Sequence, residues 1–171
     1  MADPFDFGGG IINPNHAANP GLIYDMGTEE YTHYLCSEAY NISDIRNLTG
    51  HRCPNKKSSI LNLNQPSITI PRLTKSTTLT RTVTNVGDAQ SKYKAEVEAP
   101  DGVKVKVRPH ILRFTASGQR LSFKVTVTST HKMNIGFVFG SLTWKDENHT
   151  VRIPLAVRTE YSLATEAKDE L

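Results

Sequence analysis

The sequence predicts an all-β fold, in which seven short strands form an antiparallel sandwich after an irregular segment with one short helix. From about residue 67 onward, apolar and polar residues alternate with a period of two, and β-branched residues are abundant. Turn-forming residues separate these stretches, and no helical period is visible among them. Short alternating strands joined by turns are typical of a β-sandwich.

Each expected strand has one apolar face. The alternation is clearest at residues 121–127, where every second side chain is apolar. The polar residues 145–148 supply a tight turn between the last two strands. The expected strands cover residues 67–70, 77–86, 93–99, 103–107, 121–127, 137–144 and 151–157. The expected core consists of Tyr93, Val97, Phe123, Val125, Leu142, Trp144, Ile153 and Leu155.

Two positions interrupt the alternation. Arg81 has the same parity as the apolar residues two positions before and after it, so either a bulge reverses the face or the arginine is paired. In the strand before residue 145, the apolar set shifts from Phe137 and Phe139 to Leu142 and Trp144. This shift predicts a second bulge, near Gly140.

The first 60 residues are irregular. Glycine and proline interrupt this segment repeatedly before residue 22, which excludes a long helix or strand there. One helix is expected after Thr28, because Glu29 and Glu30 would lie in its first turn, where acidic side chains favour the helix dipole. The segment has too few apolar residues for a core of its own. We therefore expect three parts: residues 1–60, a domain at residues 61–160 and an acidic tail at residues 161–171.

Two cysteines, Cys36 and Cys53, lie in the irregular segment. Taken alone, such a pair is also consistent with two buried thiols. Two of the three N-x-S/T sequons, at Asn41 and Asn47, fall between the cysteines in a loop-like stretch, and the third is at Asn148. This combination favours a disulfide formed in an oxidising compartment, and N-glycosylation at the three asparagines.

The charge pattern and the histidines argue against several functions. The net charge is +3, and Lys104, Lys106 and Arg108 alternate with valines, as on the outer face of a half-buried strand. No basic stripe contains interleaved aromatic residues, so no nucleic-acid partner is expected. The histidines lack metal-ligand spacing, and no phosphate-binding loop or nucleophile elbow occurs. We therefore expect no metal, no cofactor and no catalytic residue.

Membrane association is not expected either. No run of 18 apolar residues occurs, and the N-terminus shows no signal-peptide pattern. From its residues alone, the chain is interpreted as a secreted binding or structural module.

A series of motifs runs through residues 2–160. The most specific is Leu-Thr-Arg-Thr-Val-Thr-Asn-Val-Gly at residues 79–87. Others are Asp-Pro-Phe-Asp-Phe-Gly-Gly-Gly at 3–10, Pro-Gly-Leu-Ile-Tyr-Asp at 20–25 and Gly-Ser-Leu-Thr-Trp at 140–144. In this order and spacing they resemble the C-terminal region of plant subtilisin-like serine proteases (subtilases, peptidase S8 family), which comprises the end of the peptidase domain and a fibronectin-III-like domain.

The resemblance implies a fibronectin-III-like sandwich and a non-catalytic chain. In the family, the catalytic serine follows a Gly-Thr-Ser-Met sequence, and this tetrapeptide is absent here. The aspartate and histidine motifs of the triad lie further upstream in the family. Asp25 and His33 are therefore not expected to be triad members. The chain as given is not expected to be an enzyme, although the family consists of serine-type endopeptidases.

The resemblance also implies a partner, the peptidase domain of the same protein, on which this region packs and which it stabilises. A free-standing binding or decoy module is the alternative, and a homodimer is a further expectation. Apolar side chains of the irregular segment would form the docking surface: Phe5, Phe7, Ile11, Ile12, Leu22, Ile23 and Tyr24.

The expected location is extracellular or the cell wall, as for the family. The C-terminal residues Lys168, Asp169, Glu170 and Leu171 form an ER-retrieval sequence, which makes the ER lumen the alternative.

Overall fold

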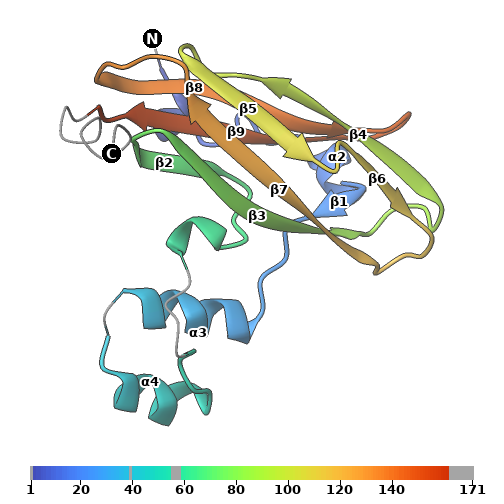
Figure 1. Cartoon of the computed structure of the whole chain (residues 1–171). Coiled ribbons are helices and arrows are strands. Elements are labelled where there is room, and N and C mark those ends of the chain that lie inside the picture. Colours follow the sequence, from blue (N-terminus) through green and yellow to red (C-terminus); the bar gives the residue numbers. More distant parts are fainter. Residues whose placement is uncertain (1, 39, 55–58, 162–171) are drawn as a thin grey trace.

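The computed structural model describes residues 2–38, 40–54 and 59–161, which form a β-sandwich with a helical extension (Figure 1). The all-β prediction is confirmed, although these residues form nine strands rather than seven. The strands are β1 (Leu22–Ile23), β2 (Ile68–Leu73), β3 (Ser76–Asn85), β4 (Ser91–Glu98), β5 (Val103–Arg108), β6 (Ile111–Phe114), β7 (Arg120–Ser129), β8 (Ile135–Lys145) and β9 (Thr150–Thr159). The helices are α1 (Pro4–Phe7), α2 (Pro14–Ala18), α3 (Thr28–Ser37), α4 (Ile42–Thr49) and the 3₁₀ helix η1 (Ile60–Asn62).

Two sheets form the layers of the sandwich. A four-stranded sheet has the order β1-β3-β7-β5, and a five-stranded sheet has the order β2-β9-β8-β4-β6. β2 and β9 run parallel, with Ile68 opposite Leu155, which corrects the expectation of a wholly antiparallel sandwich. Most of the sandwich separates these two strands in sequence, so no tight turn forces them to be antiparallel. The unexpected strands, β1 and β6, have two and four residues, too few to show a clear period.

The core lies between the two sheets. Seven of the eight expected core residues are at most 1% exposed. Phe123 and Trp144 meet edge to face with 4.9 Å between ring centroids, an arrangement that aromatic pairs favour. Val97 is the exception, because it is 38% exposed. β6 pairs with β4 only from Ser91 to Lys94, so Val97 lies where β4 forms the edge of the sheet.

Arg81 is paired, and its strand has no bulge. β3 pairs with β7 along its length without a register shift, and Arg81 is 4% exposed. Its guanidinium donates hydrogen bonds to the carbonyl oxygens of Leu61 (2.5 Å), Gln65 (3.2 Å) and Ser67 (3.0 Å). Burial lowers the pKa of Arg81 to about 10, so the side chain stays charged at neutral pH. Arg81 thereby fixes the segment before β2 against β3.

The bulge expected near Gly140 is absent. β8 pairs with β9 without a shift from Phe137 to the end of the strand, and the irregularity lies at the start of β8. Phe137 and Phe139 do not point into the core but lie half-buried against the ring of Phe5. Gly140 serves a different purpose, because a Cβ there would lie 2.2 Å from the carbonyl oxygen of Glu98. The glycine lets the chain leaving β4 pass close to β8.

Four α-helices, rather than one, occur in the described part of the first 60 residues. α1 and α2 each begin with proline after a capping side chain, Asp3 or Asn13. The prolines that predicted interruptions therefore start short helices. α3 is the helix expected after Thr28. α4 occupies the stretch expected to be a loop, where Asn41 caps its start and Gly50 ends it in a left-handed conformation.

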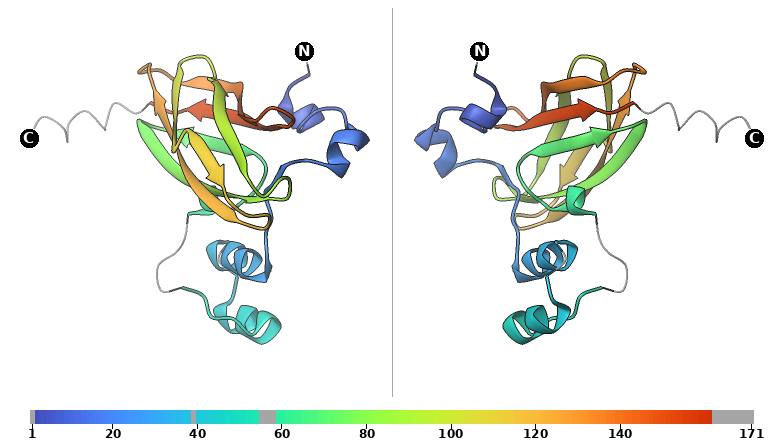
Figure 2. Two further views of the ribbon diagram at one scale, coloured as in Figure 1. Left: turned by 90° about the vertical axis from the view of Figure 1, so that its right-hand side faces the viewer. Right: turned by 90° about the vertical axis from the view of Figure 1, so that its left-hand side faces the viewer.

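α3 and α4, here called the helical pair, lie beside the sandwich rather than on its core (Figures 1 and 2). Cys36 and Cys53 form the expected disulfide, which joins the end of α3 to the segment after α4. Arg120 of β7 lies 3.6 Å from Glu30 of α3. Asn64 donates hydrogen bonds to the carbonyl oxygen of Asp25 (3.0 Å) and to that of Thr82 on β3 (2.9 Å). Polar contacts thus position the helical pair.

Candidate docking surface

Two of the seven expected docking residues pack in or against the core of the sandwich, which corrects that expectation. Leu22 is 2% exposed and lies in β1, opposite Asn85 of β3. The ring of Tyr24 packs edge-on against Phe123, with 6.5 Å between centroids, and burial raises the pKa of its hydroxyl. Both residues follow Gly21, whose carbonyl oxygen accepts a hydrogen bond from the Val86 N–H. The N-terminal segment is therefore attached to the sandwich through β1, which forms an edge strand beside β3.

Phe5 lies on the outer face of the five-stranded sheet. Its ring meets Phe137 at 4.9 Å and Phe139 at 5.6 Å, both edge to face. The guanidinium of Arg158 stands 5.7 Å from the centroid of Phe137, a distance at which a cation is attracted to an aromatic face. Phe5 is nevertheless 55% exposed, so this aromatic cluster is only partly covered by the chain itself.

The remaining expected docking residues are uncovered. Ile11 is 99% exposed and Ile12 is 80% exposed, while Phe7 and Ile23 are about half and about a third exposed. Exposing two adjacent isoleucines is unfavourable, since burying each would contribute about 1.5–3 kcal/mol. The structure therefore leaves a connected apolar stretch of the N-terminal segment without a covering element among the described residues.

The helical pair carries further exposed apolar side chains that the sequence reasoning missed. Ile42 and Leu48 of α4 are 64% and 81% exposed, and Tyr31 of α3 is also exposed. Only Thr32 and Ile45 are buried within the two helices. The spacing of Ile42, Ile45 and Leu48 after the capping Asn41 is a helical signal, which predicts an amphipathic helix in that stretch.

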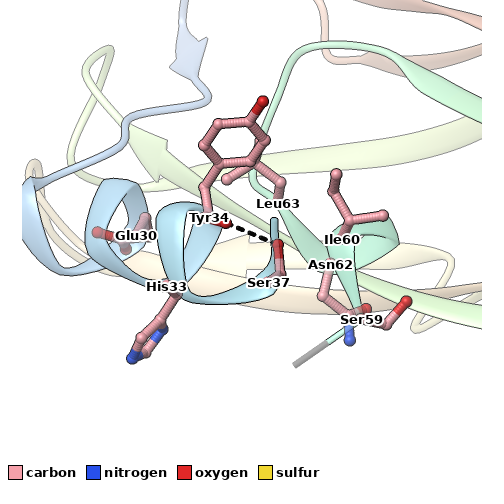
Figure 3. A pocket seen from close by; sticks show the side chains of 8 residues that line it. All are labelled: Glu30, His33, Tyr34, Ser37, Ser59, Ile60, Asn62 and Leu63. Atoms are coloured by element: carbon pink, nitrogen blue, oxygen red, sulfur yellow. Dashed lines mark hydrogen bonds between the residues drawn. The ribbon is translucent and has the colours of Figure 1, made fainter. Parts of the chain in front are cut away.

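A groove of about 160 Å³ separates α3 from η1 (Figure 3). In the groove, the Ser37 hydroxyl donates a hydrogen bond to the Tyr34 carbonyl oxygen, at 2.7 Å (Figure 3). Hydrogen bonds to Glu30 from its own backbone N–H and from that of Gly27 lower the pKa of this carboxyl group. The groove is lined by Glu30, His33, Tyr34, Ser37, Ser59, Ile60, Asn62 and Leu63.

Asp25 and His33 have structural contacts. The Asp25 carboxylate accepts a hydrogen bond from the Thr84 hydroxyl at 2.7 Å, and His33 lies 4.0 Å from Glu29 of the same helix. Among residues 2–38, 40–54 and 59–161, no three His, Cys, Asp or Glu side chains are grouped so that they could hold a metal ion.

Asp146 organises the turn between β8 and β9. Its carboxylate accepts hydrogen bonds from the N–H groups of Asn148 and His149, and lies 3.0 Å from the His149 ring Nδ1. Burial alone would raise the pKa of Asp146, but these hydrogen bonds outweigh burial and hold it below its usual value. Gly21 packs against the same cluster, because a Cβ there would lie 2.5 Å from the Tyr93 hydroxyl. The cluster of Asp146, His149 and Tyr93 thus holds Gly21, the residue directly before β1, in place.

The three sequon asparagines all have exposed side chains. Asn41 precedes α4 and caps it, Asn47 lies within α4, and Asn148 lies in the turn between β8 and β9. Asn41 therefore lies at the start of α4 and Asn47 lies on α4 rather than in a loop, whereas Asn148 lies on the sandwich.

Residues 62–157 match the Fibronectin type-III domain family, over more than half of the chain. The chain belongs to this family. The matched residues extend from the end of η1 to β9, so the fibronectin type-III domain contains every strand except β1. The expectation of a fibronectin-III-like sandwich is thereby confirmed.

The helical pair and the fibronectin type-III domain together match longer proteins. Over 162 residues, 94% of the chain, it is 54% identical to Subtilisin-like protease SBT3.8 and 56% identical to Subtilisin-like protease SBT3.3, both from Arabidopsis thaliana. Each match covers 21% of the relative, so the chain spans about a fifth of the length of these curated relatives. The resemblance to plant subtilisin-like proteases is confirmed.

Among solved structures, half of the chain superposes on a FixG-related protein from Vibrio parahaemolyticus. The TM-score is 0.42 with 15% identity, and 79% of that protein is covered, a likeness too low to carry an inference. In the described part of the chain, no helix has the length and apolar character required to span a bilayer.

Proposed function

We propose that this chain is the non-catalytic C-terminal region of a subtilisin-like serine endopeptidase, which packs on and stabilises the peptidase domain of the same protein. The uneven distribution of uncovered apolar side chains carries the proposal. Of the fourteen large hydrophobic side chains that are exposed among the described residues, eleven precede residue 61. Exposed apolar patches of this kind mark interaction surfaces.

The fold explains why these side chains lack a cover. The sandwich buries its own apolar faces between two sheets, whereas α1, α2 and the helical pair extend from it on different sides (Figure 2). In this proposal residues 1–60 are the end of the peptidase domain, and residues 61–160 are the fibronectin type-III domain. The peptidase domain then supplies the missing core for Ile11, Ile12 and Ile42.

The test mixes the full chain with the separately expressed peptidase domain of its parent protein. We expect the peptidase domain to retain activity longer on heating when the chain is present. We also expect hydrogen exchange at residues 4–24 to slow. The double variant Ile11→Asp/Ile12→Asp should bind at least about tenfold more weakly, since two buried side chains become charged.

Met133→Asp is the control for adding a charge at an exposed apolar side chain, because Met133 is 55% exposed between β7 and β8 of the sandwich. This variant should bind like the unmodified chain. If the chain neither slows inactivation nor gains protection at residues 4–24, the alternative of a free-standing binding or decoy module is favoured. Sedimentation of the chain alone shows whether it is a monomer or a homodimer. If a homodimer forms through this surface, the Ile11→Asp/Ile12→Asp variant should be monomeric.

The absence of catalysis is a separate part of the proposal. We expect a serine-reactive fluorophosphonate probe to leave the chain unlabelled, whether or not the peptidase domain is present. Labelling that is lost when one serine of this chain is replaced by alanine would contradict this part and leave the docking part unaffected.

We further propose an extracellular or cell-wall location with N-glycans at Asn41, Asn47 and Asn148. The disulfide and the exposure of all three asparagines support this proposal. Enzymatic removal of N-glycans from the secreted protein should lower its mass by up to three glycans. Protein without glycans that is retained in the ER lumen would contradict it. The retrieval sequence at residues 168–171 lies outside the described residues.

A further inference from the structure

The outer face of β3, β5 and β7, in the four-stranded sheet, is rich in basic and hydroxyl side chains. Paired residues of neighbouring antiparallel strands share one face, and here the core-facing partners are mostly valines and leucines, together with Phe123 and the buried Arg81. The outward rows of β3, β5 and β7 consist of polar residues. Between β5 and β7 these rows pair Lys104 with Thr128, Lys106 with Thr126 and Arg108 with Lys124. β3 continues the rows with Ser76, Thr78, Thr80 and Thr82.

Among the residues that the structure describes, four cations of this face form no ion pair. Lys104, Lys106, Arg108 and Lys124 are exposed, and no ion pair joins them to a carboxylate in the described ranges. Basic residues elsewhere do form such pairs, for example Arg72 with Glu160. None of the outward residues in these rows is acidic. The face therefore concentrates positive charge, which raises the local concentration of anions beside it.

The hydroxyl groups beside the cations are ordered. Three cross-strand pairs are hydrogen bonded at 2.8–2.9 Å: Ser76 with Thr128, Thr78 with Thr126, and Thr82 with Ser122. A hydroxyl has one donor hydrogen and two acceptor sites, so each pair retains capacity to bond outward. The surface thus offers fixed hydroxyls in line with a row of cations.

The spacing of the cations suits an extended polyanion. Alternate residues of a strand lie about 6.6 Å apart, so Lys104, Lys106 and Arg108 span about 13 Å along β5, with Lys124 one strand away. The cations do not converge on one point, which disfavours a single small anion. The outward rows contain no aromatic side chain for stacking nucleic-acid bases and no large apolar side chain for entering a lipid bilayer.

We propose that the outer face of β5, β7 and β3 binds a linear acidic polysaccharide, whose carboxylates pair with Lys104, Lys106, Arg108 and Lys124 and whose hydroxyls bond to the serines and threonines. The site is independent of the proposed docking surface, because its residues lie on the sandwich and not on the N-terminal segment or the helical pair.

The test measures binding of the full chain to polygalacturonate, the same polymer with its carboxyl groups methyl-esterified, duplex DNA and anionic phospholipid vesicles. We expect binding to polygalacturonate, and not to the ester, that weakens as salt is raised through the range where surface charges are screened. Lys104→Glu/Lys106→Glu should weaken this binding at least about tenfold, since two attractions become repulsions.

Lys92→Glu/Arg113→Glu is the matched control, because it makes the same change in net charge on paired exposed residues of β4 and β6, in the other sheet. It should change the affinity less than about twofold. All replaced side chains are exposed, so thermal unfolding should confirm that both variants are folded. Equal loss in the two variants, equal binding of the ester, or tighter binding of DNA or vesicles would each overturn the proposal.

Discussion

Buried polar side chains hold the parts of this chain together at the scale of single residues. Arg81 connects β3 to the carbonyl oxygens of residues 61–67, and Asp146 gathers hydrogen bonds from its own turn. The hydrogen bonds of these two side chains take the place of hydrogen bonds to water that are lost on folding. A buried group that loses such partners carries a large desolvation cost, so single substitutions at these positions test the structure sharply.

Arg81→Met is expected to lower the free energy of unfolding by about 2–4 kcal/mol, because it removes the donors for the carbonyl oxygens of Leu61, Gln65 and Ser67. Urea unfolding followed by tryptophan fluorescence measures the change. Arg72→Met is the control, since Arg72 is exposed and its ion pair with Glu160 should contribute less than about 1 kcal/mol. Equal losses in the two variants would contradict the structural role of Arg81.

Asp146→Asn is expected to lower the free energy of unfolding at neutral pH by about 1–3 kcal/mol. The stability of the variant should also depend less on pH in the acid range. The folded-state pKa of Asp146 is lowered, so its contribution is present above the unfolded-state pKa of about 3.9 and is lost as pH falls through the folded-state value. Melting temperatures from pH 2 to 7 should therefore fall less steeply below about pH 4 in the variant. Asp101→Asn, at an exposed carboxylate, should retain the steep fall.

At the scale of elements, most strands could be predicted because their signal is local. β7 alternates along its whole length, so the burial of one face is visible in the sequence. β8 misled the prediction because both its faces are partly covered: Leu142 and Trp144 face the core, while Phe137 and Phe139 are half-covered by Phe5. Because α1 packs on the outer face, β8 has apolar residues on both faces. In the sequence, this change from one parity to the other looks like a bulge.

Gly140→Ala tests the account of β8 without a bulge. The new Cβ would lie 2.2 Å from the Glu98 carbonyl oxygen and 2.8 Å from Pro100, and backbone must move to admit it. We expect a loss of about 1–3 kcal/mol in thermal or urea unfolding. Gly136→Ala in the same strand is the control, because a Cβ there meets no atom within 4 Å. A neutral effect at both positions would contradict the close approach.

The whole molecule consists of two units with different sources of stability. The sandwich has a continuous apolar core, whereas the helical pair buries only Thr32 and Ile45 and is closed by the Cys36–Cys53 disulfide. The candidate docking surface was predicted only in part. Ile11 and Ile12 are uncovered as expected, whereas Leu22 lies in the core and Tyr24 packs against it, because β1 pairs with β3 across about sixty residues of sequence.

Cys36→Ser/Cys53→Ser is expected to unfold the helical pair and to leave the sandwich intact. A disulfide that closes a loop of this size contributes about 3 kcal/mol, which exceeds what two short helices with so small a core supply. Hydrogen exchange should show loss of protection in α3 and α4 with unchanged protection in β7 and β8. Loss of protection in the strands as well would mean that the two units fold together.

The sequence by itself determined the β-sandwich, the position of most strands, the start of α3 and the family resemblance. These features depend on alternation, capping and motifs, which are properties of residues close together in the chain. Only the tertiary structure decided the partners of Arg81, the parallel pairing of β2 with β9, the exposure of Val97 and the gathering of cations beside hydroxyls on one face. These features depend on which distant segments lie next to each other, and no local pattern encodes that choice.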